Sequence, residues 1–246
     1  MGKRPQSWNE TPSIGKGYIM SFQHTPEFEF GTLQTQIANG KRHYVIPGGG
    51  LYPSVTTVTG FEKNEFFKEW REKNPEESKR VLRRGNNLHW TIEDYLNNSE
   101  GYITNRSELD HITKDNLIDL FNMLKPILDE NIDNIVAQEV GLFSNALRLA
   151  GRVDCVADYN GVRSIIDFKG STREKREGDI ETYFLQATAY AIMWQELTKQ
   201  PIKQIVILIA NETGTAQVFA KDPMDYVQKL KEQIEKYEEK FGGVVV

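Results

Sequence analysis

The sequence predicts an α+β fold in which a central mixed β-sheet is flanked by helices and follows an N-terminal helical elaboration. Three features of the apolar pattern support this prediction. Apolar residues recur at helical spacing between about residues 62 and 130. From about residue 135 the pattern changes to short strands, two of which are joined by Asn160-Gly161, a dipeptide typical of hairpin turns. Strands and helices then alternate to the end of the chain.

A hairpin is the first element that the sequence predicts. After an irregular start, the chain alternates in a strand-like way from Phe28 to Ile46 around Asn39-Gly40. Gly48-Gly49-Gly50 and Pro53 then end this unit. We therefore divide the chain into an N-terminal extension with a β-hairpin over residues 1–50 and a single domain over residues 51–246.

Helices are expected where apolar residues recur every three or four positions, with Pro75 and Gly101 between them. The expected helices span residues 62–73, 76–98, 107–130 and 182–199, and a last one ends near 241. In the second helix the spacing predicts one buried stripe, formed by Val81, Gly85, Leu88, Ile92 and Leu96. The expected strands span residues 135–143, 148–159, 162–168, 203–210 and 215–220.

The composition is that of a globular protein and excludes several kinds of site. Hydrophobic residues make up 39% of the 246 residues, so the chain can bury a sizeable core. Its one cysteine, Cys155, excludes a disulfide framework and four-cysteine zinc or iron–sulfur sites within one chain. The longest aliphatic run, residues 205–210, is far shorter than the roughly 20 residues that span a bilayer. Residues 1–12 lack the pattern of a targeting peptide, so we expect an intracellular, cytoplasmic protein.

The net charge of −5 argues against a generic binder of polyanions, but the charges are unevenly distributed. Residues 108–133 contain seven acidic and two basic residues, which account for the whole acidic excess. Residues 79–89 carry four basic residues and no acidic one. We therefore expect the acidic segment to face solvent or to turn away from a substrate.

Two aspartates and a lysine form the most informative pattern. Asp154 lies in one predicted strand and Asp167 near the end of its hairpin partner, so their carboxylates can converge at one end of the sheet. Carboxylate oxygens are hard ligands that suit Mg²⁺ or Mn²⁺. Lys169 projects from the same face as Asp167 and could orient a water or offset charge on a phosphate. In isolation the Asp-x-Lys tripeptide is also typical of ordinary surface charges.

Four more residues extend this pattern. His89 lies on the apolar helix stripe, where it could be a metal ligand or a core histidine. Glu139 could supply a third carboxylate or be a solvated strand residue. Gln186 and Tyr190 are four residues apart and share one helix face, which also suits a half-buried polar pair.

In chain order these residues give a helix histidine, then Gly-x-x-Asp, Asp-x-Lys and Gln-x-x-x-Tyr. This series resembles the RecB-type branch of the PD-(D/E)XK nucleases, and most closely the mitochondrial genome maintenance exonuclease family and its phage and bacterial relatives. The likeness covers about residues 52–240. Its closest parts are Val153-Asp154-Cys155-Val156-Ala157, Ile166-Asp167-Phe168-Lys169 and Leu185-Gln186-Ala187-Thr188-Ala189-Tyr190.

The resemblance implies a PD-(D/E)XK core and metal-dependent hydrolysis of DNA phosphodiester bonds, from a free end of single-stranded DNA. It implies neither an iron–sulfur cluster, which one cysteine cannot hold, nor a nucleotide cofactor. The lack of a transit peptide favours a phage or bacterial source over a mitochondrial one. By motif, the ligands of Mg²⁺ or Mn²⁺ would be Asp154, Asp167, the Phe168 carbonyl, His89 and Glu139. Lys169 would be the catalytic lysine, which Gln186 and Tyr190 would orient unless they contact the phosphate.

Contacts to DNA are expected from basic, aromatic and hydroxyl side chains on both sides of this site, although solvated charged faces are the alternative. They are Ser54, Thr56, Arg80, Arg83, Arg84, Trp90, Ser171, Arg173 and Lys175. Two other functions stay open: a duplex-specific exonuclease or structure-specific endonuclease of the same fold, and a non-catalytic DNA-binding subunit. We expect a monomer that works with replication, recombination or repair proteins and not at a membrane.

Overall fold

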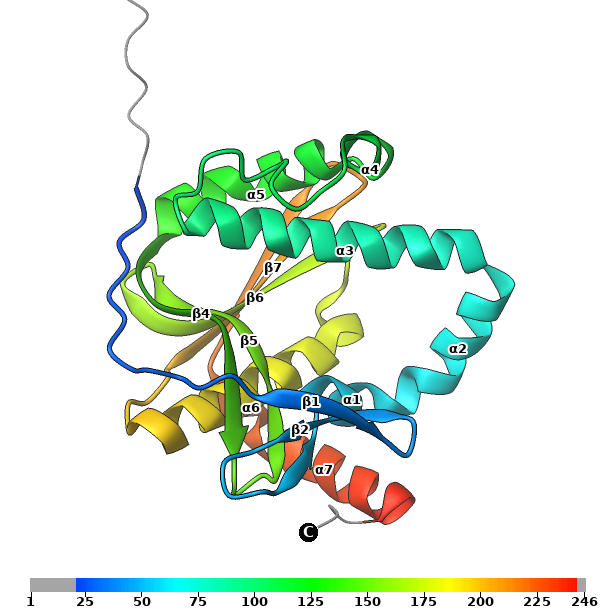
Figure 1. The fold of residues 1–246 in the computed structure, drawn as a ribbon, viewed down its shortest axis with the longest axis vertical. Helices are drawn as coiled ribbons and strands as arrows, with labels where there is room; N and C mark the ends of the chain where they lie inside the picture. Colours follow the sequence, from blue (N-terminus) through cyan, green and yellow to red (C-terminus); the bar gives the residue numbers. More distant parts are fainter. Residues whose placement is uncertain (1–20, 243–246) are drawn as a thin grey trace, which may run out of the picture.

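The computed structural model describes residues 21–242, and at its centre lies a five-stranded sheet in the order β4-β5-β6-β7-β8. The strands are β4 (Ile132–Ser144), β5 (Leu149–Tyr159), β6 (Val162–Ser171), β7 (Gln204–Asn211) and β8 (Ala216–Lys221). The first three are antiparallel, β7 runs parallel to β6, and β8 runs antiparallel to β7. The predicted mixed sheet is therefore confirmed (Figure 1).

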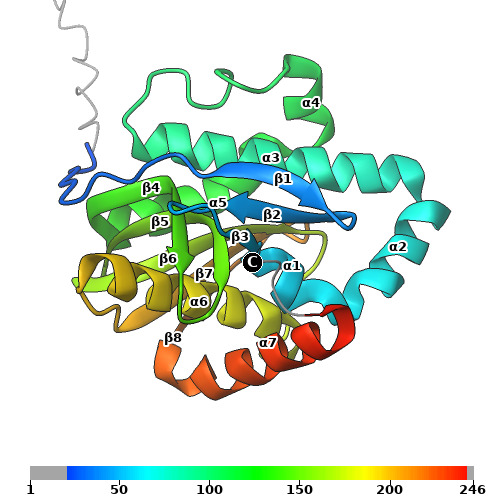
Figure 2. The same cartoon turned by 60° about the horizontal axis from the view of Figure 1, so that its bottom comes forward.

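Helices cover both faces of this sheet. They are α3 (Pro75–Leu96), α5 (Leu117–Asn131), α6 (Glu181–Thr198) and α7 (Val227–Phe241). Figure 2 shows α6 and α7 on one side of the sheet and α3 and α5 on the other. Strand β7 is buried on both sides, because Ile205, Ile207 and Ile209 pack in the core with α6 while Val206, Leu208 and Ala210 pack with α3 and α5.

The helical region before the sheet differs from the prediction in one place. Helices α2 (Asn64–Lys73) and α3 lie where they were expected, and Leu88, Ile92 and Leu96 of the predicted stripe are fully buried. The single helix expected over 107–130 is wrong: α4 (Leu109–Lys114) and α5 are separate helices. The chain breaks there because Asn116 adopts a left-handed conformation, with φ of 52°, next to Asp115, whose buried carboxylate pairs with α3.

The N-terminal part forms a small antiparallel sheet of its own. Strands β1 (Gln34–Ala38) and β2 (Lys41–Val45) make the predicted hairpin, and Asn39 and Gly40 both have positive φ, as a type I′ turn requires. The unit ends at Pro53, as expected, but the glycine run is followed by a third strand that was not predicted, β3 (Leu51–Pro53), which returns to pair with β2. Helix α1 (Val55–Gly60) and the 3-10 turn η1 (Phe61–Lys63) then lead to α2.

Before β1, the chain runs along the outer edge of β4. The amide of Thr25 donates to the Ile135 carbonyl at 2.8 Å, and the amide of Ile135 donates to the Gln23 carbonyl at 2.8 Å. Further on, Leu33 packs on Gly141, where an added Cβ would lie 2.8 Å from Leu33 Cγ. This covering satisfies part of an edge that would otherwise expose unpaired backbone groups. Residues 1–20, which belong to the expected N-terminal extension, lie outside the described part of the chain.

No helix within residues 21–242 is both long enough and apolar enough to cross a membrane.

Candidate active site

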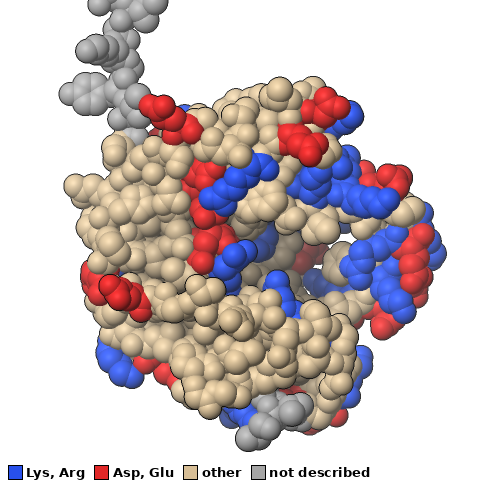
Figure 3. Space-filling model, in the orientation of Figure 1, with Lys and Arg blue, Asp and Glu red and all other residues tan. Residues whose placement is uncertain are grey.

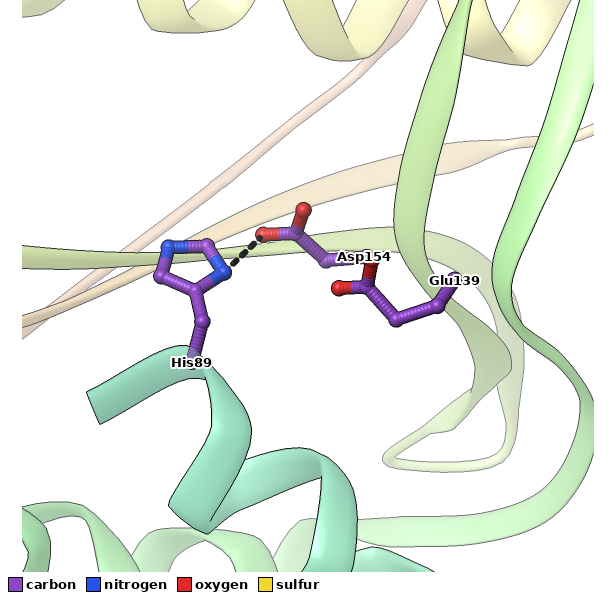
Figure 4. Close-up of side chains that lie close together, drawn as sticks. All are labelled: His89, Glu139 and Asp154. Carbon is purple, nitrogen blue, oxygen red and sulfur yellow. Dashed lines mark ion pairs between the residues drawn. The ribbon is translucent and has the colours of Figure 1, made fainter. Parts of the chain in front are cut away.

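Three predicted ligands meet where α3 crosses the sheet. His89 of α3, Glu139 of β4 and Asp154 of β5 each offer one donor atom, and these atoms lie within 4.8 Å of one another. His89 Nδ1 is 3.4 Å from Asp154 Oδ2, and Glu139 points toward the same space (Figure 4). All three side chains are half-buried, so the cluster is shielded from bulk water but still accessible.

An irregular backbone positions Glu139. Gln138 pairs with Cys155 and Val140 with Val153, which places Glu139 across from Asp154 on the neighbouring strand. Glu139 itself has a φ of +51°, a left-handed conformation that is unusual for a non-glycine residue in a strand. Such a conformation costs on the order of 1–3 kcal/mol, so the surrounding structure must hold Glu139 in it.

The cluster concentrates negative charge. Burial and the neighbouring carboxylate of Asp154 raise the pKa of Glu139 to about 7, although Arg152, whose Nε lies 2.8 Å from Glu139 Oε2, opposes this rise. Asp154 Oδ2 accepts a hydrogen bond from the Phe168 amide at 3.0 Å, which fixes it beside the backbone of β6. Two crowded carboxylates and an imidazole form a donor set that a divalent cation would neutralise, so these residues fit a Mg²⁺ or Mn²⁺ site.

Asp167 and Lys169 form a second pair on β6. Lys169 Nζ donates to Asp167 Oδ1 at 2.8 Å and lies 2.7 Å from Oδ2. Gln186 Nε2 of α6 donates to the same Oδ1 at 3.2 Å. Asp167 is 1% exposed and is not part of the three-residue donor cluster among the described residues.

The protonation of this pair follows from burial and charge. Burial raises the pKa of Asp167 and outweighs the opposing effect of Lys169. Burial alone would lower the pKa of Lys169, but the carboxylates of Asp167 and Asp154 outweigh it and hold that pKa above its ordinary value. Lys169 is therefore a protonated, hydrogen-bond-donating group at neutral pH.

The position of the Tyr190 ring explains why the first residue of the Gly-x-x-Asp motif is a glycine. A Cβ on Gly151 of β5 would lie 2.7 Å from the Tyr190 hydroxyl, so only glycine leaves room for the ring. Tyr190 is 2% exposed, and its pKa is raised by burial and by nearby Asp154. The Gln-x-x-x-Tyr helix thus contacts the sheet through two side chains, one at Asp167 and one beside the strand that carries Asp154.

The predicted DNA contacts fall into two groups. Trp90 is 37% exposed, Thr56 and Arg173 are exposed and Lys175 is half-buried, while Ser54 and Ser171 are buried and hydrogen-bond within the protein. The three arginines of α3 all bind acidic groups. Arg80 pairs with Glu77 and Glu212, Arg83 with Asp115, and Arg84 with Glu212. These ion pairs fix α3 to its neighbours.

Two residues of the site were not predicted. The ring of Tyr183 lies with its centroid 5.2 Å from Lys169 Nζ, a cation–π contact. Its position three residues before Gln186 on α6, and hence on the same helix face, is a signal that could have indicated it. Glu212 follows directly after β7 and binds two arginines of α3. Its pairing across the fold has no signal in the sequence.

Comparison with known proteins identifies a family for this chain. The family model described as the PD-(D/E)XK nuclease superfamily matches residues 61–243. No curated protein matches the chain. Among solved structures, one similar chain is described as "Putative exonuclease" from Eubacterium rectale, with a TM-score of 0.38 and 13% identity. The match covers 64% of this chain and 65% of that one, so this chain spans less than two thirds of that protein.

The contact of Gly151 with Tyr190 can be tested by substitution. Gly151→Ala should lower the free energy of unfolding by about 1–3 kcal/mol, because the new methyl group overpacks a buried ring. In a Tyr190→Ala background the same change should cost much less. Urea unfolding of the wild type, the two single variants and the double variant measures these free energies. Gly178→Ala is the control, since a Cβ at Gly178 meets nothing within 4 Å. Equal costs in both backgrounds would contradict the contact.

Proposed function

The chain belongs to the PD-(D/E)XK nuclease superfamily, and we propose that it is a divalent-metal-dependent exonuclease that hydrolyses single-stranded DNA from a free end. The observation that carries this proposal is the cluster of His89, Glu139 and Asp154 beside the Asp167–Lys169 pair. A carboxylate-rich donor set next to a held ammonium group suits the hydrolysis of a phosphodiester.

In the proposed site, His89, Glu139 and Asp154 would hold Mg²⁺ or Mn²⁺. The motif would add Asp167 and the Phe168 carbonyl to these ligands. When bound, such an ion supplies electrophilic stabilisation for a phosphate that is attacked by water. Asp167 lies near the donor cluster in space, since the Asp154 carboxylate accepts a hydrogen bond from the amide of Phe168, the residue after Asp167.

The side chains of the protein then position the reacting groups. The Lys169 ammonium donates hydrogen bonds to the attacking water or to the phosphate, where it offsets the charge that develops on oxygen. The Asp167 carboxylate holds that ammonium in place, and Gln186 donates a hydrogen bond to the same carboxylate. Tyr190 fixes the distance between α6 and β5, the strand that carries Asp154.

The shape of the molecule supports a single-stranded substrate. Figure 3 shows a hollow between α3, α2 and the β1–β2 hairpin, with both basic and acidic side chains around its rim. Helices α2 and α3 also carry exposed aromatic residues, including Phe66, Phe67 and Trp90. Exposed cationic and aromatic side chains on neighbouring elements suit a single strand, whose bases can stack on aromatic rings. A duplex-specific exonuclease or structure-specific endonuclease, and a non-catalytic DNA-binding subunit, are the alternatives.

Substitution of the pair on β6 tests the proposed reaction. Asp167→Asn and Lys169→Ala should each lower Mg²⁺-dependent degradation of linear single-stranded DNA by about 10²-fold or more. Lys169 acts on the reacting phosphate, and Asp167 holds the Lys169 ammonium and would bind the metal ion. Lys203→Ala, at the opposite end of the sheet, should leave the rate of DNA degradation unchanged. End-labelled linear and circular substrates, single- and double-stranded, measure the rates. Cleavage of circles would favour the endonuclease, and binding without turnover would favour the non-catalytic subunit.

Metal binding should stabilise the fold. At a free Mn²⁺ concentration of 100 Kd, the free energy of unfolding should rise by about 2.7 kcal/mol. Asp154→Asn should remove most of this rise, whereas Asp158→Asn should keep it, because Asp158 lies on the same strand but pairs with Arg163 and Asn134. Thermal unfolding with Mn²⁺ and with EDTA measures the difference. A full rise in the Asp154→Asn protein would rule out this cluster as the metal site.

Tyr183 should act as a positioning residue for Lys169. Tyr183→Phe keeps the ring and should keep kcat, whereas Tyr183→Leu should lower kcat by about 2- to 30-fold, the equivalent of a cation–π contact of 0.5–2 kcal/mol. KM should stay unchanged in both, since the ring contacts the lysine and not the substrate. Steady-state kinetics on single-stranded DNA decides this. A parallel loss in the two variants, or a change confined to KM, would exclude the positioning role.

A further inference from the structure

Lys175 is a half-buried cation without an anionic partner. It lies in the loop after β6, and its backbone is fixed on both sides by Gln217 of β8: its amide donates to Gln217 Oε1 at 2.8 Å, and Gln217 Nε2 donates to its carbonyl at 2.9 Å. Its ammonium makes no ion pair or hydrogen bond to any residue between 21 and 242. The loop is thus rigid while the charge at its centre is unpaired.

The groups around Lys175 are mostly cations. Burial lowers the pKa of Lys175, and the positive charges of Arg173, Lys63 and Arg84 lower it further, with Asp179 acting in the opposite direction. Lys63 reaches this loop from η1, where its Nζ donates to the Asp179 carbonyl at 3.3 Å. Arg84 is already neutralised by Glu212. Lys63, Arg173 and Lys175 therefore form a group of neighbouring cations. The acids of the same segment mostly bind elsewhere: Glu174 accepts from Thr215, and Glu177 pairs with Lys221.

This cluster lies next to the candidate active site. Strand β6 carries Asp167 and Lys169, ends at Ser171 and continues directly into the loop. Ser171 Oγ donates to the Arg173 carbonyl at 2.7 Å and accepts from the Arg173 amide at 3.3 Å, which folds the start of the loop back on the strand end. Arg173 and Lys175 thus follow the end of β6 that carries the Lys169 ammonium, and Lys63 joins them from η1.

The unpaired charge indicates an external anion. A half-buried ammonium loses part of its hydration, and among the described residues Asp179 is the acidic group that offsets this loss, without an ion pair to Lys175. The arginines of α3 differ, because each already has an acidic partner in the protein. We propose that Lys63, Arg173 and Lys175 bind a backbone phosphate of the DNA strand, adjacent to the bond that is cleaved. This inference rests on the proposed function. It assigns the phosphate contacts to η1 and to the loop between β6 and the 3-10 turn η2 (Glu177–Ile180), and not to α3.

The salt dependence of DNA binding tests this site. On single strands, each phosphate contact contributes about 0.7 to the slope of log K against log salt concentration. Lys63→Ala and Lys175→Gln should each reduce the slope by about that amount. Lys203→Ala removes the same charge at the start of β7, the opposite end of the sheet, and should leave it unchanged. Fluorescence anisotropy of a labelled oligothymidylate measures binding with Ca²⁺ in place of Mg²⁺, and a gel verifies that the oligonucleotide stays intact.

The outcomes separate this inference from the proposed function. A reduced slope for Lys63→Ala and Lys175→Gln, with wild-type melting temperatures and an unchanged Lys203→Ala protein, supports the phosphate site. An unchanged slope for both variants in a protein that still degrades DNA overturns the site but not the nuclease. An equal reduction in all three variants also overturns it, because the effect is then one of total charge. A reduced slope in a protein that never degrades DNA supports the site and contradicts the nuclease.

Discussion

The docking of α3 on the sheet is the interaction on which the site depends. The helix brings His89 to Asp154, although the two residues are far apart in the sequence. Leu88 and Ile92 are fully buried on either side of His89 and anchor the helix to the apolar face of the sheet. The pairing of Arg84 with Glu212 adds a second, polar attachment at the end of β7. Because Arg84 is 1% exposed, a shift of α3 would leave a buried charge without its partner.

The sheet concentrates acidic side chains at that meeting point. Glu139 and Asp154 face each other across neighbouring strands, and Asp167 lies buried on the next strand with a lysine as its counter-ion. Burial of carboxylates is unfavourable unless cations compensate for it. For Asp167 the protein supplies the cation itself. Beside Glu139 lies Arg152, whose side chain is exposed and therefore compensates less than the half-buried Lys169 does for Asp167, so this half of the site favours a bound cation more strongly.

Much of this fold could be predicted from the sequence, because it follows from local patterns. The β1–β2 hairpin followed from Asn39-Gly40, and the Asp-x-Lys spacing correctly placed two side chains on one face of a strand. The rest depends on long-range contacts. The break at Asn116 depends on an ion pair between Asp115 and α3, and the three arginines of α3 find acidic partners that are distant in sequence. A basic helical stripe alone does not reveal such partners.

The covered edge of β4 has a consequence for the chemistry of the site. Side chains alternate between the two faces of a strand, so a slip of β4 by one residue would turn Glu139 away from Asp154. The backbone bonds of Gln23 and Thr25 with Ile135, and the packing of Leu33 on Gly141, hold β4 on the side that β5 does not reach. The N-terminal segment therefore fixes the register of β4 and, from outside the site, keeps the Glu139 carboxylate beside Asp154.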